Sequence, residues 1–269
     1  LLLLPVLIIW VAGLFWFFFY SIYRVIGWIY LLVIVLLIAG SGKNYYSLGI
    51  YPVLLAGGAV AWEQWTQSKK WIRYVLLFSI IGITIPFLRI GLPMEEPEAL
   101  TTYYEKKGYA RLGILEWEDH QNHALPQDFA DMLGWKELAE KAELFFVFFS
   151  DSSRANTIIY CRNYGQAGAL QFYGKNEYFR QKVISDNGSF LLWIPDSLLL
   201  RNLIFIGRSV PKMGDEVFQH FKTVSMADSV TNPLCRQLGD KIIFFENADT
   251  SASGLANKII KDKKKEFNY

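Results

Sequence analysis

The sequence predicts an α-helical transmembrane bundle of about four spans, joined to a small extracytoplasmic α/β domain. Two observations carry this prediction. The first 93 residues consist almost wholly of apolar runs with Glu63 as their one carboxylate, whereas later residues hold all the other acids. Beyond residue 125, short β-branched runs alternate with helical patterns, which is typical of an α/β layer. The formal net charge of +2 does not favour a nucleic-acid partner.

The apolar runs give the predicted spans their positions. We place the spans at residues 1–20, 25–40, 48–62 and 72–92. A straight helix needs about 20 apolar residues to cross the hydrocarbon layer. The second and third runs are short by that measure, but tryptophan and tyrosine residues flank them and suit the membrane interfaces.

These runs also divide the chain. We predict transmembrane helices at 1–93, a linker at 94–125, a soluble domain at 126–255 and a basic tail at 256–269. The tail is expected to be solvated or disordered, because its lysines lie far from any span.

The basic residues of the short loops set the predicted orientation. Lys69, Lys70 and Arg73 lie between the third and fourth spans, so this loop is expected on the cytoplasmic side. The protein is then a multi-pass membrane protein of the plasma or inner membrane. The loop at 41–44 and all residues after the fourth span are expected outside the cytoplasm.

The outer loop contains candidate substrate-binding residues. Lys43, Tyr45, Tyr46 and Tyr51 follow one another closely at the predicted outer membrane surface. A lysine suits a phosphate, and tyrosines offer hydroxyls to polar groups and rings to a lipid chain or a sugar. The alternative is that Lys43 reaches the lipid head groups and that the tyrosines form an aromatic belt.

Four motifs, in order along the chain, carry a resemblance to a known family. They are Gly-Lys-Asn-Tyr-Tyr-Ser-Leu-Gly-Ile-Tyr-Pro-Val-Leu-Leu-Ala-Gly-Gly-Ala at 42–59, Leu-Pro-Gln-Asp-Phe-Ala-Asp-Met-Leu-Gly-Trp at 125–135, Asn-Tyr-Gly-Gln-Ala-Gly-Ala at 163–169 with Phe-Tyr-Gly at 172–174, and Ile-Ser-Asp-Asn-Gly-Ser-Phe at 184–190 with Trp193. Together they resemble the dolichyl-phosphate-mannose protein mannosyltransferase-like membrane glycosyltransferases, a group that includes the aminoarabinose transferase of lipid A.

The resemblance implies a partial bundle of the GT-C type and a function. Such an enzyme transfers a sugar from a polyprenyl-phosphate carrier to a lipid, glycan or protein acceptor on the outer membrane face. Lys43 then contacts the donor phosphate. The family's catalytic carboxylate lies in an early outer loop, so we expect it upstream of Leu1 and expect this chain to be the C-terminal part of a longer enzyme. No cofactor is implied.

The soluble domain is predicted from its local patterns. A helix is expected after Pro126, with Phe129, Met132, Leu133, Leu138 and Ala142 on one face. A further short helix is expected at 166–173. The predicted strands lie at Thr157–Cys161, Val183–Ile184, 190–194, 203–206 and 241–245.

Two side-chain groups, one in the predicted linker and one in the soluble domain, leave alternatives open. The first group is a cluster of acidic and histidine side chains: Glu116, Glu118, Asp119, His120 and His123. It forms either a solvated loop, which we favour, or a divalent-metal site. Cys161 and Cys235 are the only cysteines. We expect Cys161 to be a buried free thiol, and a disulfide in an extracytoplasmic domain is the alternative.

Two other functions compete with the transferase. A membrane-anchored scaffold that binds a glycan or a protein would show the same organisation. A transporter is disfavoured, because Glu63 lies at the inner end of its span and transport sites concentrate near the middle of the membrane.

Overall fold

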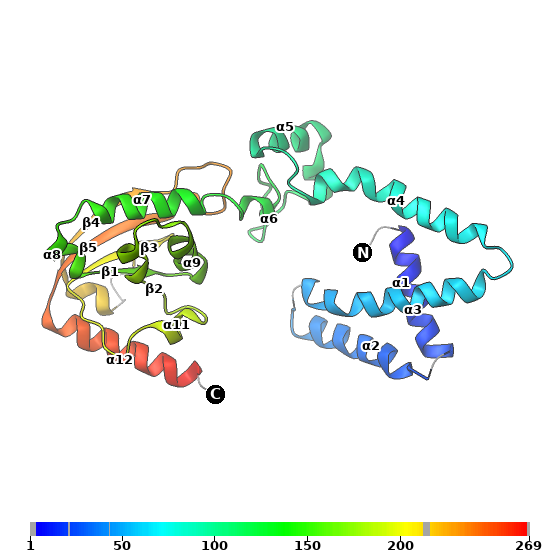
Figure 1. Ribbon diagram of the computed structural model, residues 1–269, viewed down its shortest axis with the longest axis horizontal. Coiled ribbons are helices and arrows are strands. Elements are labelled where there is room, and N and C mark those ends of the chain that lie inside the picture. The colour runs from blue at the N-terminus through cyan, green and yellow to red at the C-terminus, as the bar shows by residue number, and fades with distance from the viewer. Residues whose placement is uncertain (1–3, 21, 43, 212–215, 268–269) are drawn as a thin grey trace. The chain divides into compact units, whose positions relative to one another are not determined.

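The computed structural model of the protein describes residues 4–20, 22–42, 44–211 and 216–267. Contacts divide the chain into two compact units, Leu1–Met94 and Glu95–Tyr269. Each unit has its own hydrophobic core. Figure 1 shows the helices and strands of each unit. The boundary falls where the apolar helices end and the acidic residues begin.

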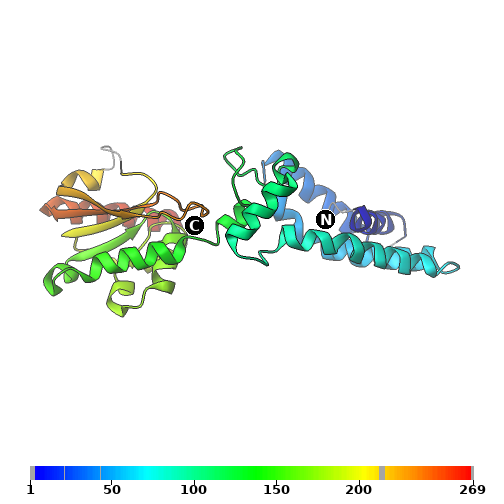
Figure 2. The same ribbon diagram turned by 90° about the horizontal axis from the view of Figure 1, so that it is seen from above.

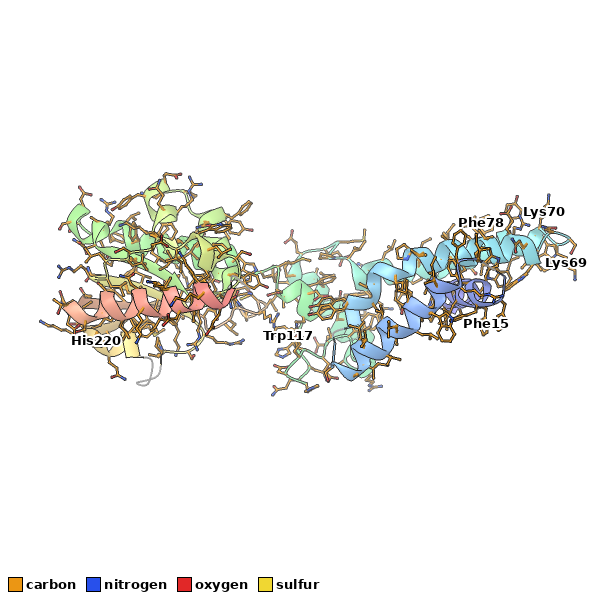
Figure 3. The ribbon with its side chains drawn as sticks, turned by 90° about the horizontal axis from the view of Figure 1, so that it is seen from below. Phe15, Lys69, Lys70, Phe78, Trp117 and His220 are labelled. Atoms are coloured by element: carbon orange, nitrogen blue, oxygen red, sulfur yellow. The ribbon has the colours of Figure 1, made fainter. Side chains whose placement is uncertain are left out.

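The described part of the first unit is helical. It consists of α1 (Leu4–Tyr20), α2 (Arg24–Ala39), the 3-10 helix η1 (Asn44–Ile50), α3 (Tyr51–Trp65) and α4 (Trp71–Gly91). Apolar side chains point outward from these helices, as Figure 3 shows for Phe15 and Phe78, while Lys69 and Lys70 lie at the turn before α4.

Two glycines let α1 and α3 cross closely. A Cβ atom on Gly13 would clash with the backbone of Leu54, and one on Gly58 would clash with the backbone of Ile9. Small residues of this kind allow helix backbones to approach where larger side chains would hold them apart. The α1–α3 crossing therefore depends on these positions staying glycine.

The structure shows that the predicted fold class, an α-helical transmembrane bundle of about four spans, is wrong. Among the described residues, α4 is the one helix that is both long and apolar enough to cross a membrane, with 21 residues. The helices α1, α2 and α3 contain 17, 16 and 15 residues. The third predicted span is shortened because its first residues belong to η1. The chain combines helices with a mixed five-stranded sheet and is of the α/β class.

The second unit contains the sheet. Its helices are α5 (Pro97–Lys107), η2 (Tyr109–Leu112), α6 (Gln127–Ala130), α7 (Trp135–Val147), α8 (Asp151–Ala155), α9 (Tyr164–Tyr173), α10 (Glu177–Gln181), α11 (Phe190–Trp193), η3 (Glu216–His220) and α12 (Thr250–Phe267). Its strands are β1 (Thr157–Cys161), β2 (Val183–Ile184), β3 (Asn202–Gly207), β4 (Phe221–Ser229) and β5 (Lys241–Ala248).

The strand order is β2-β1-β3-β5-β4. β1 pairs in parallel with β2 and with β3, whereas β5 runs antiparallel to β3 and to β4. After β1 the chain therefore forms β2 on one side of β1 and then crosses to form β3 on the other side. In open sheets of this kind, such a reversal places a crevice at the carboxyl ends of the parallel strands.

Helices cover both faces of the sheet, which makes its central strands apolar throughout. Ile159 and Ile204 pack with α7 and α9 on one face. Ile158 and Leu203 pack with α11 and α12 on the other. Figure 1 shows α7 and α12 on opposite sides of the strands, and Figure 2 shows the same layers turned by 90°. Burial on two faces explains why β1 and β3 read as continuous apolar runs rather than as alternating ones.

Several predicted elements differ from the observed ones. Residues 190–194, predicted as a strand, form the helical turn α11. The helix expected after Pro126 is interrupted, because Gly134 adopts a φ of 85° between α6 and α7. The strand β4 was not predicted.

The predicted linker and tail both contain ordered structure. Within 94–125, Leu100, Tyr104, Leu115 and Leu125 are buried in a cluster with Phe129. Within 256–269, the residues up to Phe267 belong to α12, whose apolar face packs on the sheet.

Candidate functional site

The candidate donor-site residues of the first unit lie in different surroundings. Lys43 is outside the described residues. Tyr45 and Tyr46 lie on η1, are 55% and 58% exposed, and have ring centroids 4.8 Å apart. Tyr51 is the first residue of α3, and its ring packs against Trp10 at 5.4 Å. Tyr45 and Tyr46 are thus accessible to a ligand, whereas Tyr51 belongs to the packing between helices.

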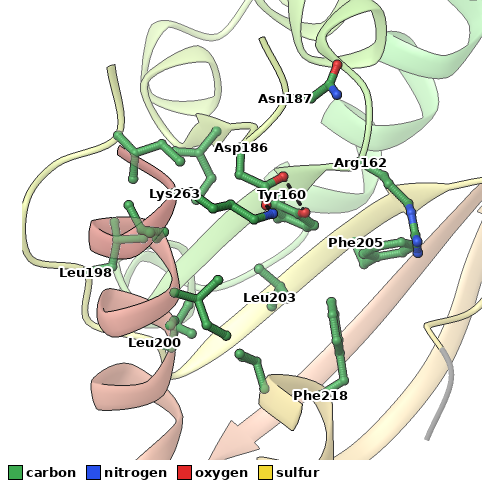
Figure 4. Close-up of a pocket in the computed structure, with 16 residues that line it drawn as sticks. Tyr160, Arg162, Asp186, Asn187, Leu198, Leu200, Leu203, Phe205, Phe218 and Lys263 are labelled. Atoms are coloured by element: carbon green, nitrogen blue, oxygen red, sulfur yellow. Dashed lines mark hydrogen bonds and ion pairs between the residues drawn. The ribbon is translucent and has the colours of Figure 1, made fainter. Parts of the chain in front are cut away.

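The second unit contains a cavity of about 560 Å³. It lies between the sheet face formed by β1 and β3 and the helix α12 (Figure 4). Its wall is mainly apolar, with these side chains: Ile184, Ile194, Leu198, Leu200, Leu203, Phe205, Val217, Phe218, Ala256, Ile259 and Ile260. A cavity of this size falls within the range of about 300 to 1,000 Å³ that is usual for small-molecule sites.

The polar lining residues are Tyr160, Arg162, Asp186, Asn187 and Lys263. Arg162 follows β1, and Asp186 and Asn187 follow β2, so the parallel strands deliver them to the same edge. Lys263 comes from α12 on the opposite wall. The strand order therefore brings together polar residues that are distant in the sequence.

A hydrogen-bonded network joins three of these side chains. The Tyr160 hydroxyl donates to Asp186 Oδ1 at 2.7 Å, and Lys263 Nζ donates to Asp186 Oδ2 (Figure 4). Burial raises the pKa of Tyr160, and the Asp186 carboxylate raises it further. Tyr160 is therefore a protonated donor at neutral pH, and Asp186 accepts from both walls of the cavity.

Arg162 lies beside this network. Its backbone N–H donates to the Ile206 carbonyl at 3.0 Å, which holds the residue at the end of the β1–β3 ladder. Its guanidinium is exposed, and in Figure 4 the side chain extends toward Phe205. With the residues that the structure describes, this side chain makes no hydrogen bond or ion pair. The polar end of the cavity thus carries a cation whose hydrogen-bonding capacity is available to a ligand.

A second polar pair lies behind the same sheet edge. Gln166 Nε2 donates to Asp240 Oδ2 at 2.7 Å, and both side chains are buried. Burial raises the pKa of Asp240, while the Gln166 hydrogen bond and the charge of Arg208 oppose that rise. This pair joins α9 to the start of β5 and supports the strand edge from which the cavity residues extend.

The acidic loop forms separate pairs rather than one cluster. His120 Nδ1 lies 3.2 Å from Glu116 Oε1, and His123 Nε2 lies 2.9 Å from Asp119 Oδ2. The His123 ring also stacks on Trp117, with centroids 3.6 Å apart. Within the described ranges, no three His, Cys, Asp or Glu side chains gather as ligands of a metal ion.

Cys161 and Cys235 are buried free thiols, as expected for Cys161. Burial raises the pKa of the Cys161 thiol, so it stays protonated and unreactive in the folded chain.

Comparison of the chain with protein-family profiles, with curated proteins and with solved structures found no match. The family resemblance of the four sequence motifs therefore stays a prediction.

Sequence reasoning did not identify the cavity. Asp186 and Asn187 fall inside one of the motifs that carry the family resemblance, and Arg162 directly precedes another, but nothing in the sequence placed them near Lys263. The sequence did contain one signal, which was the position of these polar residues directly after two predicted buried strands. If such strands are parallel, the residues that follow them tend to meet at one edge of the sheet.

Proposed function

We propose that the protein acts in glycosyl transfer at a membrane, as the C-terminal portion of an enzyme that uses a polyprenyl-phosphate-linked sugar. The acceptor is a lipid, a glycan or a protein. The observation that carries the proposal is the exposed pair Tyr45 and Tyr46, on the short helix between Lys43 and α3. Such a pair offers apolar rings to a lipid chain and hydroxyls to its polar head.

The apolar surface of α4 supports a location at a membrane. None of its residues is buried, and its exposed side chains include Trp71, Phe78 and Phe87. Lys69 and Lys70 directly precede the helix. By the bias of basic residues toward the cytoplasm, this turn is the cytoplasmic end, and residues from Glu95 onward follow on the extracytoplasmic side.

The proposed chemistry assigns Lys43 a role at the leaving group. An acceptor hydroxyl attacks the anomeric carbon of the sugar, the bond from that carbon to the phosphate oxygen breaks, and the polyprenyl phosphate departs with the electron pair. The acceptor proton passes to a carboxylate base. The ammonium group of Lys43 stabilises the charge that develops on the phosphate.

Substituting Lys43 with alanine in the full-length protein tests the proposal. Transfer from a polyprenyl-phosphate sugar should fall about 100-fold, as it does when a group that stabilises the transition state is removed. Lys69→Ala is the matched control, since it removes a lysine at the end of another apolar helix, and it should leave transfer unchanged. Equal transfer by both variants and the wild type would remove Lys43 from the mechanism.

The alternative is a membrane-anchored binding protein without catalysis. It would use the same exposed apolar surface and the cavity of the second unit. Full-length protein that retains a carbohydrate or protein ligand, and that transfers no sugar from any polyprenyl-phosphate donor, would favour this alternative.

A further inference from the structure

The cavity between the sheet and α12 is the most developed site outside the proposed donor region. Its volume of about 560 Å³ is enough for a small-molecule ligand, and its mouth is open to solvent. Away from the polar residues at the mouth, the wall consists of aliphatic and phenylalanine side chains, which offer water no hydrogen-bonding partners. The apolar part is therefore suited to a hydrocarbon ligand.

Among the described residues, the polar end of the cavity has an excess of positive charge. Asp186 is already bonded to Tyr160 and to Lys263, so the negative charge of this carboxylate is compensated. Arg162 adds a second cation, which makes no hydrogen bond or ion pair with the described residues. An anionic group placed here can accept the guanidinium hydrogen bonds that the described residues leave unused.

Exposure shows which end of the cavity meets solvent. The Lys263 side chain is 47% exposed and Arg162 is exposed as well. By contrast, Leu203, Phe205 and Ala256 are buried. A ligand with a charged head at the open end and an apolar chain toward these buried residues matches the distribution of charge and apolar surface.

We propose that the second unit binds a single-chain amphiphile with an anionic head, such as an alkyl phosphate, in this cavity. The alkyl chain lies among the apolar side chains that β3, η3 and α12 contribute to the wall. The phosphate accepts hydrogen bonds from Arg162 and from Lys263 at the mouth. This site is independent of the proposed donor site, because it uses residues of the second unit alone.

The test measures binding of dodecyl phosphate and of dodecanol to the full chain in nanodiscs of neutral phosphatidylcholine. Both probes also dissolve in the bilayer. The Ala256→Phe variant reports this background, because a phenylalanine side chain at that buried lining position occupies part of the space that the alkyl chain needs. Unchanged protection of the Cys161 thiol confirms that the variant is folded.

Arg162→Gln is the decisive variant, because the Arg162 side chain is exposed and can be replaced without disturbing the core. It should weaken dodecyl phosphate binding at least about tenfold, since a charge-assisted hydrogen bond is lost. Binding of dodecanol should not change. Arg201→Gln is the matched control, because Arg201 is an exposed arginine of the same unit that does not line the cavity.

Three results would overturn the proposal. Dodecyl phosphate could bind no better to the wild type than to Ala256→Phe. It could also bind to Arg162→Gln as tightly as to the wild type. Finally, inorganic phosphate could bind as tightly as dodecyl phosphate, which would make the site one for free phosphate rather than for a lipid.

Discussion

Replacing Glu137 with glutamine should destabilise the second unit, because this carboxylate joins α7 to the segment that follows β4. Its Oε1 accepts hydrogen bonds from the backbone N–H and the hydroxyl of Thr231, each at 2.7 Å. Its Oε2 accepts from the Asn232 N–H at 3.2 Å, and Lys141 Nζ lies 2.9 Å from Oε1. A neutral amide keeps the shape of this group but loses the ion pair and weakens the other bonds.

The shift in the pKa of Glu137 sets the size of the expected loss in the free energy of unfolding. Burial alone would raise the pKa, but the hydrogen bonds from Lys141, Thr231 and Asn232 outweigh burial and lower it from 4.5 to about 2. At about 1.36 kcal/mol per pKa unit, the shift corresponds to roughly 3.4 kcal/mol. The side chain is 24% exposed, so solvent screening reduces this figure, and we expect a loss of about 2 kcal/mol.

The direction of the pH dependence follows from the lowered pKa. The charged form is the one favoured by folding, so its contribution is fully present above about pH 4.5 and is lost as the pH falls toward about 2. The stability difference between the wild type and Glu137→Gln should therefore shrink by roughly half between pH 7 and pH 3.

Urea unfolding of the full chain measures this difference. In a Cys235→Ala background, the reaction of Cys161 with a dipyridyl disulfide reports opening of the sheet, in acid as well as at neutral pH. Glu140→Gln is the control, because Glu140 lies on the same helix and its ion pair with Lys136 spans 3.9 Å at the surface. Equal losses in the two variants, or a difference that stays constant from pH 7 to pH 3, would refute the reasoning.

Two further pairs of substitutions, each a test with its control, probe the packing of the two units. Phe146→Ala, in the core between α7 and the sheet, should cost about 3 to 5 kcal/mol in urea unfolding, whereas Phe148→Ala, 79% exposed, should cost less than about 0.5 kcal/mol. Gly58→Val should separate α1 from α3 and speed amide hydrogen exchange in both helices about tenfold or more. Gly82→Val on α4, where an added Cβ has no neighbour within 4 Å, should leave exchange in α1 and α3 unchanged, and equal exchange in the two variants would contradict the close crossing.

The strands β1, β2, β3 and β5 were predictable because burial on both faces makes them compact apolar runs. β4 was not, since its exposed edge position gives the polar sequence Phe-Lys-Thr-Val-Ser-Met-Ala-Asp-Ser. The run at 190–194 is apolar and short, and such a run does not distinguish a strand from a buried helical turn. The bundle prediction was wrong because apolar composition does not fix where helices end.

The candidate sites differ in how far the sequence could define them. Tyr45 and Tyr46 could be selected because they lie together in one short segment. The cavity is assembled from β1, β2, β3, η3 and α12, so its lining depends on tertiary contacts such as Lys263 with Asp186. Lys263 was assigned to a solvated tail, because the sequence does not show which surface the apolar face of α12 covers.

The parallel pairing of β1 with β3 also affects how the protein is made. Thr157 pairs with Asn202, and Cys161 with Ile206, so β1 leaves the ribosome well before its central partner. At roughly 5 to 20 residues per second, translation leaves β1 unpaired for seconds. During that interval the Cys161 thiol is open to oxidants that cannot reach it later. Recombinant yield should therefore respond to the redox conditions during synthesis more than to those during storage.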